Sequence, residues 1–255
     1  MSDAGFKDHF SSVAGAYASW RPSYPAAVFD AIAEHVGPKA RVWEPGCGSG
    51  QATRDLASRF GHVFATDPSA EQVQQHWASQ APPGNVQVSV EAAESPSLAD
   101  SSVELVCVAQ ALHWFDRARF FAECDRVLRP GGVLAAWTYQ DMVFSDDLTP
   151  AADAFRRTIA AYWPPERAEV DAGYAHYDWP FEKLSAPQPW LTAEWTLPQL
   201  LGYLGSLSAS ARCLAATGMD PVAAHTAELA AAWGQPGQAR TMRRPLVVHL
   251  RRKSR

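Results

Sequence analysis

Between residues 26 and 139, short apolar runs alternate with segments whose hydrophobic positions recur at helical spacing. Segment 26–36, for example, places Val28, Phe29 and Ile32 on one helical face. The apolar runs predict strands at 41–44, 62–67, 85–92, 103–110 and 133–139, and the amphipathic segments predict helices at 26–36, 51–60, 69–79 and 116–128. Short apolar strands that are separated by helices are typical of a parallel sheet covered on both faces.

The pattern changes after Tyr139. Residues 141–200 contain many prolines and four tryptophans with little clean periodicity, which predicts irregular structure packed by aromatic side chains. Helices are expected again at 196–208 and 225–234, and a closing strand at 245–253. We therefore expect the part beyond residue 140 to be a lid or a substrate-side insertion.

Composition and charge exclude several classes of protein. The chain has 255 residues, 47% of them hydrophobic, and a formal net charge of −5, so no overall positive field favours nucleic acid or anionic lipid. The first residues lack the cationic and apolar pattern of a leader, and no run of about 18 apolar residues occurs. These features predict a soluble, cytoplasmic protein with no nucleic-acid or membrane partner, and they leave its oligomeric state open. The basic end, 251–255, is expected to be a solvated terminus.

The four cysteines are far apart in the sequence and form no CxxC pair, and no histidine lies near them at metal-ligand spacing. Buried, reduced thiols are expected, and no metal site is predicted.

A glycine-rich loop follows the first predicted strand, in the sequence E-P-G-C-G-S-G at residues 44–50. It lacks the lysine of a GxxxxGK[ST] phosphate loop. A dinucleotide GxGxxG pattern fails in both registers, because Gln51 or Thr53 stands where the third glycine is needed. The spacing therefore disfavours nucleoside triphosphates and, less strongly, a nicotinamide dinucleotide.

Two acidic residues suggest a different ligand. Glu44 stands directly before the loop, where it suits a cation and repels a pyrophosphate. Asp67 ends the second strand, where a carboxylate can accept both hydrogens of a ribose diol. The pair indicates a positively charged nucleoside such as S-adenosylmethionine, although a glycine turn with an acid that only caps a helix remains an alternative.

The stretches "VWEPGCGSGQAT", "FATDPS", "EAAESPSLADSSVELVCVAQALHWFD" and "ECDRVLRPGGVLAAWTY" together resemble the class I S-adenosylmethionine-dependent methyltransferases, in particular the type 11 group. "YASWRPSYP" near the start, combined with "HWFD", is similar to the trans-aconitate methyltransferase branch. The resemblance implies an α/β, Rossmann-like fold: a seven-stranded, mostly parallel sheet with helices on both faces and a C-terminal lid or insertion between strands five and seven.

One structural domain is expected, in three stretches: N-terminal cap helices and the cofactor-binding core at 1–140, the lid or insertion with strand six at 141–240, and the closing strand and basic tail at 241–255. The resemblance also implies cofactor contacts. The loop residues Gly46, Cys47, Gly48 and Gly50 would border the methionine part of S-adenosylmethionine, with Glu44 near its amino group.

On the nucleoside side, the resemblance places the ribose hydroxyls at Asp67 and the adenine beside Pro68 or Ser69. The family often has an aspartate after strand three, where this chain has Ala92. Adenine recognition would then depend on the backbone of Ala92 and Ala93, or on Glu94. Gln110, at the end of strand four, is expected to face the same crevice.

The acceptor side offers fewer signals. His113 is the candidate base for a phenol, amine or thiol acceptor, with the ordering of its loop as the competing interpretation. Trp114 is either packing or an aromatic wall near the methyl group. Tyr17, Arg21 and Tyr24 form an aromatic and arginine cluster that could fold over the cofactor, where Arg21 could pair with a carboxylate.

The sequence thus predicts a methyltransferase that acts on a small-molecule acceptor, with a carboxylate as one candidate. Methyl transfer requires mainly alignment and exclusion of water, so a non-catalytic or regulatory S-adenosylmethionine-binding protein remains an alternative. A NAD-dependent oxidoreductase is a third, less favoured function.

Overall fold

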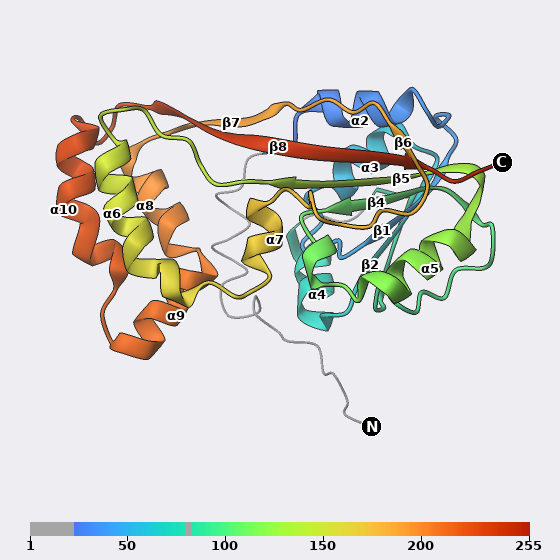
Figure 1. The fold of residues 1–255 in the computed structure, drawn as a ribbon, viewed down its shortest axis with the longest axis horizontal. Coiled ribbons are helices and arrows are strands. Elements are labelled where there is room, and N and C mark those ends of the chain that lie inside the picture. The colour runs from blue at the N-terminus through green and yellow to red at the C-terminus, as the bar shows by residue number, and fades with distance from the viewer. Residues whose placement is uncertain (1–22, 80–82) are drawn as a thin grey trace.

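The computed structural model describes residues 23–79 and 83–255, and one mixed sheet runs through its centre (Figure 1). The strand order is β3-β2-β1-β4-β5-β8-β6, and β7 pairs with β8 as an eighth strand. Neighbours from β3 to β5 are parallel, whereas β8 is antiparallel to β5, β6 and β7. The strands are β1 (Arg41–Pro45), β2 (His62–Asp67), β3 (Val86–Val90), β4 (Val103–Ala109), β5 (Leu128–Tyr139), β6 (Glu182–Leu184), β7 (Trp190–Trp195) and β8 (Arg240–Arg252).

The helices alternate with the strands in the first half of the chain and dominate the second half. They are α2 (Ala26–Ala33), α3 (Thr53–Arg59), α4 (Ala70–Ser79), η1 (Leu112–Trp114), α5 (Arg117–Val127), α6 (Thr149–Ile159), η2 (Ala160–Tyr162), α7 (Arg167–Asp171), α8 (Leu197–Gly205), α9 (Ser208–Thr217) and α10 (Pro221–Trp233). The predicted elements up to residue 139 are confirmed, with ends that differ by a few residues.

Side chains of the central strands alternate between two hydrophobic layers. On β5, Val133, Ala135 and Trp137 pack with α2 and α3 on one face of the sheet. Leu134 and Ala136 pack with α5 on the other face. All five are fully buried, and burial on both faces explains why these strands appear in the sequence as continuous apolar runs.

The prediction of seven strands is wrong by one. Residues 190–195 form β7, which pairs antiparallel with the first half of β8, from Trp190 opposite Pro245 to Trp195 opposite Arg240. The second half of β8 pairs with β5 in the main sheet. A single strand of 13 residues therefore pairs with β7 in its first half and with β5 and β6 in its second half, and its length exceeds the predicted 245–253.

The prediction of irregular structure between 141 and 200 is confirmed only in part, because Thr149–Ile159 form α6 and Arg167–Asp171 form α7, whereas most residues from 172 to 189 lie outside helices and strands. The predicted helices at 196–208 and 225–234 are confirmed as α8 and α10, and α9 between them was not predicted. Helices α6, α8, α9 and α10 form a helical lobe with its own hydrophobic cluster, at the end of the sheet marked by β7 (Figure 1). Pro150, Pro198 and Pro221 lie at the first turns of α6, α8 and α10. Proline at this position starts a helix, because the N–H that it lacks would be unpaired there anyway.

Two whole-chain expectations can be compared with the described residues. The four cysteines are free and buried, as predicted. In the part of the chain that the structure describes, no helix combines the length and apolar character needed to cross a bilayer.

Candidate functional site

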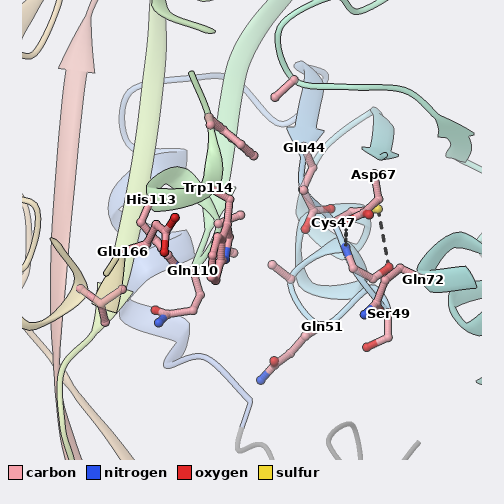
Figure 2. A pocket seen from close by; sticks show the side chains of 18 of the residues that line it. Glu44, Cys47, Ser49, Gln51, Asp67, Gln72, Gln110, His113, Trp114 and Glu166 are labelled. Atoms are coloured by element: carbon pink, nitrogen blue, oxygen red, sulfur yellow. Dashed lines mark hydrogen bonds between the residues drawn. The ribbon is translucent and has the colours of Figure 1, made fainter. Parts of the chain in front are cut away.

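A cavity of about 1080 Å³ opens at the carboxyl ends of β1, β2 and β4 and extends to the helical lobe. The crevice at this edge is where open α/β sheets bind their ligands. Figure 2 shows Glu44, Cys47 and Asp67 on one side of the cavity and Gln110, His113 and Glu166 on the other. The volume is at the upper end of the usual range for ligand pockets, so there is room for a nucleoside cofactor and a small second molecule.

The structure brings most of the predicted site residues to this cavity. Those that line it are Tyr24, Glu44, Gly46, Cys47, Gly48, Asp67, Pro68, Ala92, Ala93, Gln110, His113 and Trp114. Gly50 supports the loop from behind, where its N–H donates to the carbonyl of Cys47 at 3.0 Å. Tyr17 and Arg21 lie outside the described residues.

The glycine loop has a backbone that side chains disfavour. Gly46, Gly48 and Gly50 have φ values of 68°, 53° and 84°. This left-handed region costs a residue with a Cβ roughly 1–2 kcal/mol, which explains three glycines within five positions. The N–H of Cys47 donates to the carbonyl of Thr66 on β2 at 3.0 Å, which fixes the loop to the neighbouring strand.

Glu44 is a buried acid with an unsatisfied oxygen. The side chain is 1% exposed, Thr53 bonds its carboxyl group, and its Oε2 has no hydrogen-bond partner. Burial, together with the charge of Asp67, raises the pKa of Glu44 from 4.5 to about 8. A buried carboxyl that faces a cavity with an orphaned oxygen is suited to a cationic group.

Asp67 is held rigidly at the end of β2. Its Oδ2 accepts the N–H of Gly48 at 3.0 Å and its Oδ1 accepts the N–H of Ser69 at 2.9 Å. The Ser69 hydroxyl in turn accepts the N–H of Gln72 at 3.2 Å and so caps the start of α4. The carboxylate is therefore oriented before any ligand arrives, and its remaining lone pairs can accept from hydroxyl groups.

The part of the cavity lining that follows β3 offers few polar side chains to bind a nucleobase. Ala92 and Ala93 line the cavity, as expected. Glu94 lines it too, but its Oε1 accepts the N–H of Asp116 at 2.8 Å, and Asp116 caps α5. Glu94 was the side-chain alternative for adenine recognition, and one of its two carboxylate oxygens already accepts a hydrogen bond within the protein. Phe115, which sequence reasoning did not single out, adds an aromatic surface here.

The wall after β4 carries Gln110, His113 and Trp114. Gln110 has a φ of 55°, and its Oε1 accepts the N–H of Tyr139 and the hydroxyl of Thr138, each at 2.8 Å. The rings of His113 and Trp114 pack at 4.7 Å. Tyr24, from the other predicted cluster, is 5% exposed and packs edge-on against Trp137.

The lobe, the segment 163–167 and β8 together supply a far wall that sequence reasoning missed. It consists of Trp163, Arg167, Tyr203, Leu207 and Arg244. Arg244, on β8, is 8% exposed, and its guanidinium lies over the rings of Tyr139 at 4.9 Å and Tyr203 at 4.5 Å. No local signal marks these residues in the sequence, because long-range packing alone brings β8 and the lobe to the cavity.

These features define a Rossmann-like protein with a cofactor cavity at the carboxyl edge of its sheet, and comparisons with known proteins agree. Residues 43–136 match the family model of a methyltransferase domain. A Dictyostelium discoideum protein that bears the name methyltransferase is 32% identical over 220 residues, covering 84% of this chain and 82% of that protein.

Two further proteins make the comparison more specific. A structure described as a type II methyltransferase from Anaeromyxobacter dehalogenans has a TM-score of 0.84 and 37% identity, covering 92% of this chain and 99% of that one. A Saccharomyces cerevisiae protein named as S-adenosylmethionine-dependent is 28% identical over 135 residues, about half of each chain. The chain belongs to the class I S-adenosylmethionine-dependent methyltransferases, so its cofactor is S-adenosylmethionine and not a nicotinamide dinucleotide.

The residues of the cavity fit this cofactor. The orphaned oxygen of Glu44 suits an ammonium group, the oriented carboxylate of Asp67 suits a ribose diol, and the left-handed glycines bring backbone close to the space between them.

Replacing Asp67 by alanine should weaken S-adenosylmethionine binding by about 1–3 kcal/mol, because the ribose hydroxyls of the bound cofactor lose the carboxylate that accepts their hydrogen bonds. Calorimetry measures the dissociation constant, and Asp67→Asn is the matched control because one oxygen can still accept the N–H of Gly48. An unchanged dissociation constant in the alanine variant, with thermal unfolding like that of the wild type, would argue against a ribose role.

Proposed function

We propose that the protein methylates a small molecule that carries a carboxylate, held on the lobe side of the cavity. The observation behind this proposal is Arg244, a buried cation in the cavity wall whose guanidinium lies over two tyrosine rings. A guanidinium presents a planar fork that matches a carboxylate, and aromatic neighbours hold its plane in place. The resemblance to trans-aconitate methyltransferases is consistent with an acidic acceptor.

The remaining lining of the lobe side suits a compact organic acid. Trp163, Tyr203 and Leu207 supply apolar contact, while Ser206 and Ser208 supply hydroxyl groups. Arg167 adds a second cation, but it is already engaged by Asp171 at 2.7 Å and lies over the ring of Trp163 at 4.4 Å. Arg244 donates to the Tyr203 hydroxyl, and we choose it as the candidate for direct contact with the acid because it is the more deeply buried of the two arginines.

The chain's contribution to the reaction is alignment. S-adenosylmethionine, when bound, supplies an electrophilic methyl group on a sulfonium. Glu44 and Asp67 would hold the ammonium and ribose ends on the β1 and β2 side, and Arg244 would hold the acceptor on the lobe side. Fixing two reactants in one geometry in a water-poor cavity is the main source of rate for an in-line displacement.

A screen of small carboxylic acids, with phenols and amines that lack a carboxylate for comparison, tests the proposal through release of the demethylated cofactor. We expect turnover with acids, and we expect Arg244→Met to raise KM for the acid about tenfold to hundredfold, as for a lost charge-assisted hydrogen bond. Arg244→Lys should fall between, because it keeps the charge and loses the fork.

Arg243→Met is the matched control. Arg243 is the neighbour of Arg244 on β8, but it is exposed and lies over the ring of Trp190 at 5.2 Å, away from the cavity. We expect its KM for the acid to equal that of the wild type. Turnover confined to neutral acceptors, or equal KM values in all three arginine variants, would contradict an acidic acceptor held by Arg244.

A further inference from the structure

Glu166, the residue directly before α7, is a partly buried acid that lines the cavity. Its carboxylate forms no hydrogen bond or ion pair with any residue that the structure describes, and it does not cap α7. The charged side chains of α7 itself are all paired. Arg167 binds Asp171 at 2.7 Å, and Glu169 pairs with Arg117 at 3.7 Å. Glu166 is thus the charge of this segment that is directed to the cavity and not to the protein.

The position of Glu166 is fixed by the packing of α7, which lies against η1. Directly after β5, the side-chain amide of Gln140 donates to the carbonyl of Asp171 at 2.7 Å. Beyond the end of α7, the Tyr174 hydroxyl lies 2.9 Å from Nδ1 of His113. These contacts hold the helix beside the wall that η1 forms. Figure 2 shows the Glu166 carboxylate on this side of the cavity, across from the side that binds the cofactor.

Glu166 and its neighbour Arg167 are directed to different places. Arg167 contacts Asp171 and, at 3.8 Å, Asp141, and it lines a small side pocket of the lobe together with Arg244. Glu166 lines the main cavity and is not among the residues of this side pocket. Neither arginine is therefore paired with Glu166. Outside the cofactor side, the cavity presents a cation at Arg244 and a separate anion at Glu166.

An unpaired carboxylate in such a wall selects among the molecules that enter the cavity. Trp163, Pro164 and Val170 line the cavity near Glu166 in the sequence, so a ligand that covers this wall removes water from the carboxylate. Loss of hydration is costly for a charge that receives no partner, and a second anion beside it adds repulsion. A ligand that places a cation there recovers the cost through charge-assisted hydrogen bonds. Glu166 therefore favours a cationic group and disfavours an apolar or anionic one.

We infer that Glu166 binds an ammonium group of the methyl acceptor while Arg244 binds its carboxylate. The inference rests on the proposed function, and it narrows the acceptor from a small acid to a zwitterion, a molecule of the amino-acid class. An ammonium has no lone pair with which to attack a methyl group. The group at Glu166 is therefore held for recognition, and another atom of the acceptor receives the methyl group.

Binding to the full-length protein, saturated with the demethylated cofactor, tests the inference without turnover. The probes are unbranched ω-amino acids of increasing chain length, each compared with the monocarboxylic acid, the amine and the alcohol of the same length. Ligand-observed NMR measures the dissociation constants. At the best chain length, we expect the wild type to bind the amino acid about tenfold to hundredfold more tightly than the monocarboxylic acid, as for one added charge-assisted contact.

Three variants make the test specific to Glu166. Glu166→Gln should lose the preference for the amino acid while its affinity for the monocarboxylic acid does not fall. Glu166→Lys should reverse the preference and favour dicarboxylic acids. Glu169→Gln is the matched control, because Glu169 belongs to α7 but pairs with Arg117 and is not among the residues that line the cavity. It should keep the wild-type preference. All three should bind S-adenosylmethionine like the wild type, because the cofactor lies on the opposite side.

Arg244→Met separates this inference from the proposed function. Monocarboxylic acids report on Arg244 alone, and amines report on Glu166 alone. Acids that bind Arg244→Met as tightly as the wild type would refute the carboxylate site, whereas amines that lose affinity only in the Glu166 variants would still support the ammonium site. A wild type that binds amino acids no more tightly than monocarboxylic acids would overturn the role of Glu166. A preference that persists in Glu166→Gln, or one that Glu169→Gln abolishes equally, would overturn it too.

Discussion

Glu44→Gln should stabilise the cofactor-free protein at pH 8.5 and weaken its affinity for S-adenosylmethionine. The pKa of Glu44 is raised from 4.5 to about 8, so the folded protein holds a proton that the unfolded chain releases over this range. The wild type therefore loses stability as the pH rises from 4.5 to 8, by up to about 4–5 kcal/mol. Glutamine does not titrate, and it can keep the bond with Thr53.

Two measurements check that Glu44→Gln raises the stability of the cofactor-free protein and lowers its affinity for the cofactor. Chemical unfolding of the cofactor-free proteins should show similar stability near pH 5 and a more stable Glu44→Gln variant at pH 8.5. Calorimetry should show about tenfold to hundredfold weaker binding of both S-adenosylmethionine and its demethylated product, because both carry the ammonium group and glutamine offers it no charge.

Proton release gives an independent signature. An ammonium beside Oε2 favours the ionised form of Glu44, so cofactor binding at pH 7 should release close to one proton from the wild type and none from Glu44→Gln. Titrations in buffers with different ionisation enthalpies measure this number. A wild type that releases no proton would show that Glu44 is already ionised, or that it does not contact the ammonium.

The side of the cavity at the ends of β1 and β2 was predictable from sequence because its signals are local. Glu44, the three glycines and Asp67 lie at the ends of two neighbouring parallel strands, and strand ends of a parallel sheet meet at one edge. The predicted strands of the core were confirmed for a related reason. Burial on both faces demands apolar runs, and such runs are visible in the sequence.

The lobe half was not predictable in the same way. Arg244 reaches the cavity because β8 continues from the sheet into its pairing with β7, and Tyr174 reaches His113 through a left-handed turn after α7. Both depend on contacts between segments that are distant in the sequence. Pro150 was misleading, because a proline at the first turn of a helix and a proline in a loop are alike in composition.

Gly46→Ala should destabilise the protein by about 2–5 kcal/mol and prevent tight binding of S-adenosylmethionine. Two costs combine at this position. The φ of 68° disfavours any Cβ, and the added Cβ would lie 2.7 Å from that of Ala111 and 3.1 Å from Cζ of Phe115. The loop must move to relieve this overlap, and it lines the cavity beside Glu44. Chemical unfolding and calorimetry measure the two effects.

Two variants separate the costs of Gly46→Ala. Gly48→Ala has the same kind of strain at a φ of 53°, but its Cβ would meet only Oε1 of Gln72 at 3.8 Å, so it should lose about 1–2 kcal/mol. In the double variant Gly46→Ala/Ala111→Gly, the partner of the closest contact is absent, and part of the lost stability should return as a coupling energy. If Gly46→Ala and Gly48→Ala lose equal stability and the double variant shows no coupling, then conformational strain alone selects glycine at residue 46. The close approach of the loop to Ala111 would in that case contribute nothing.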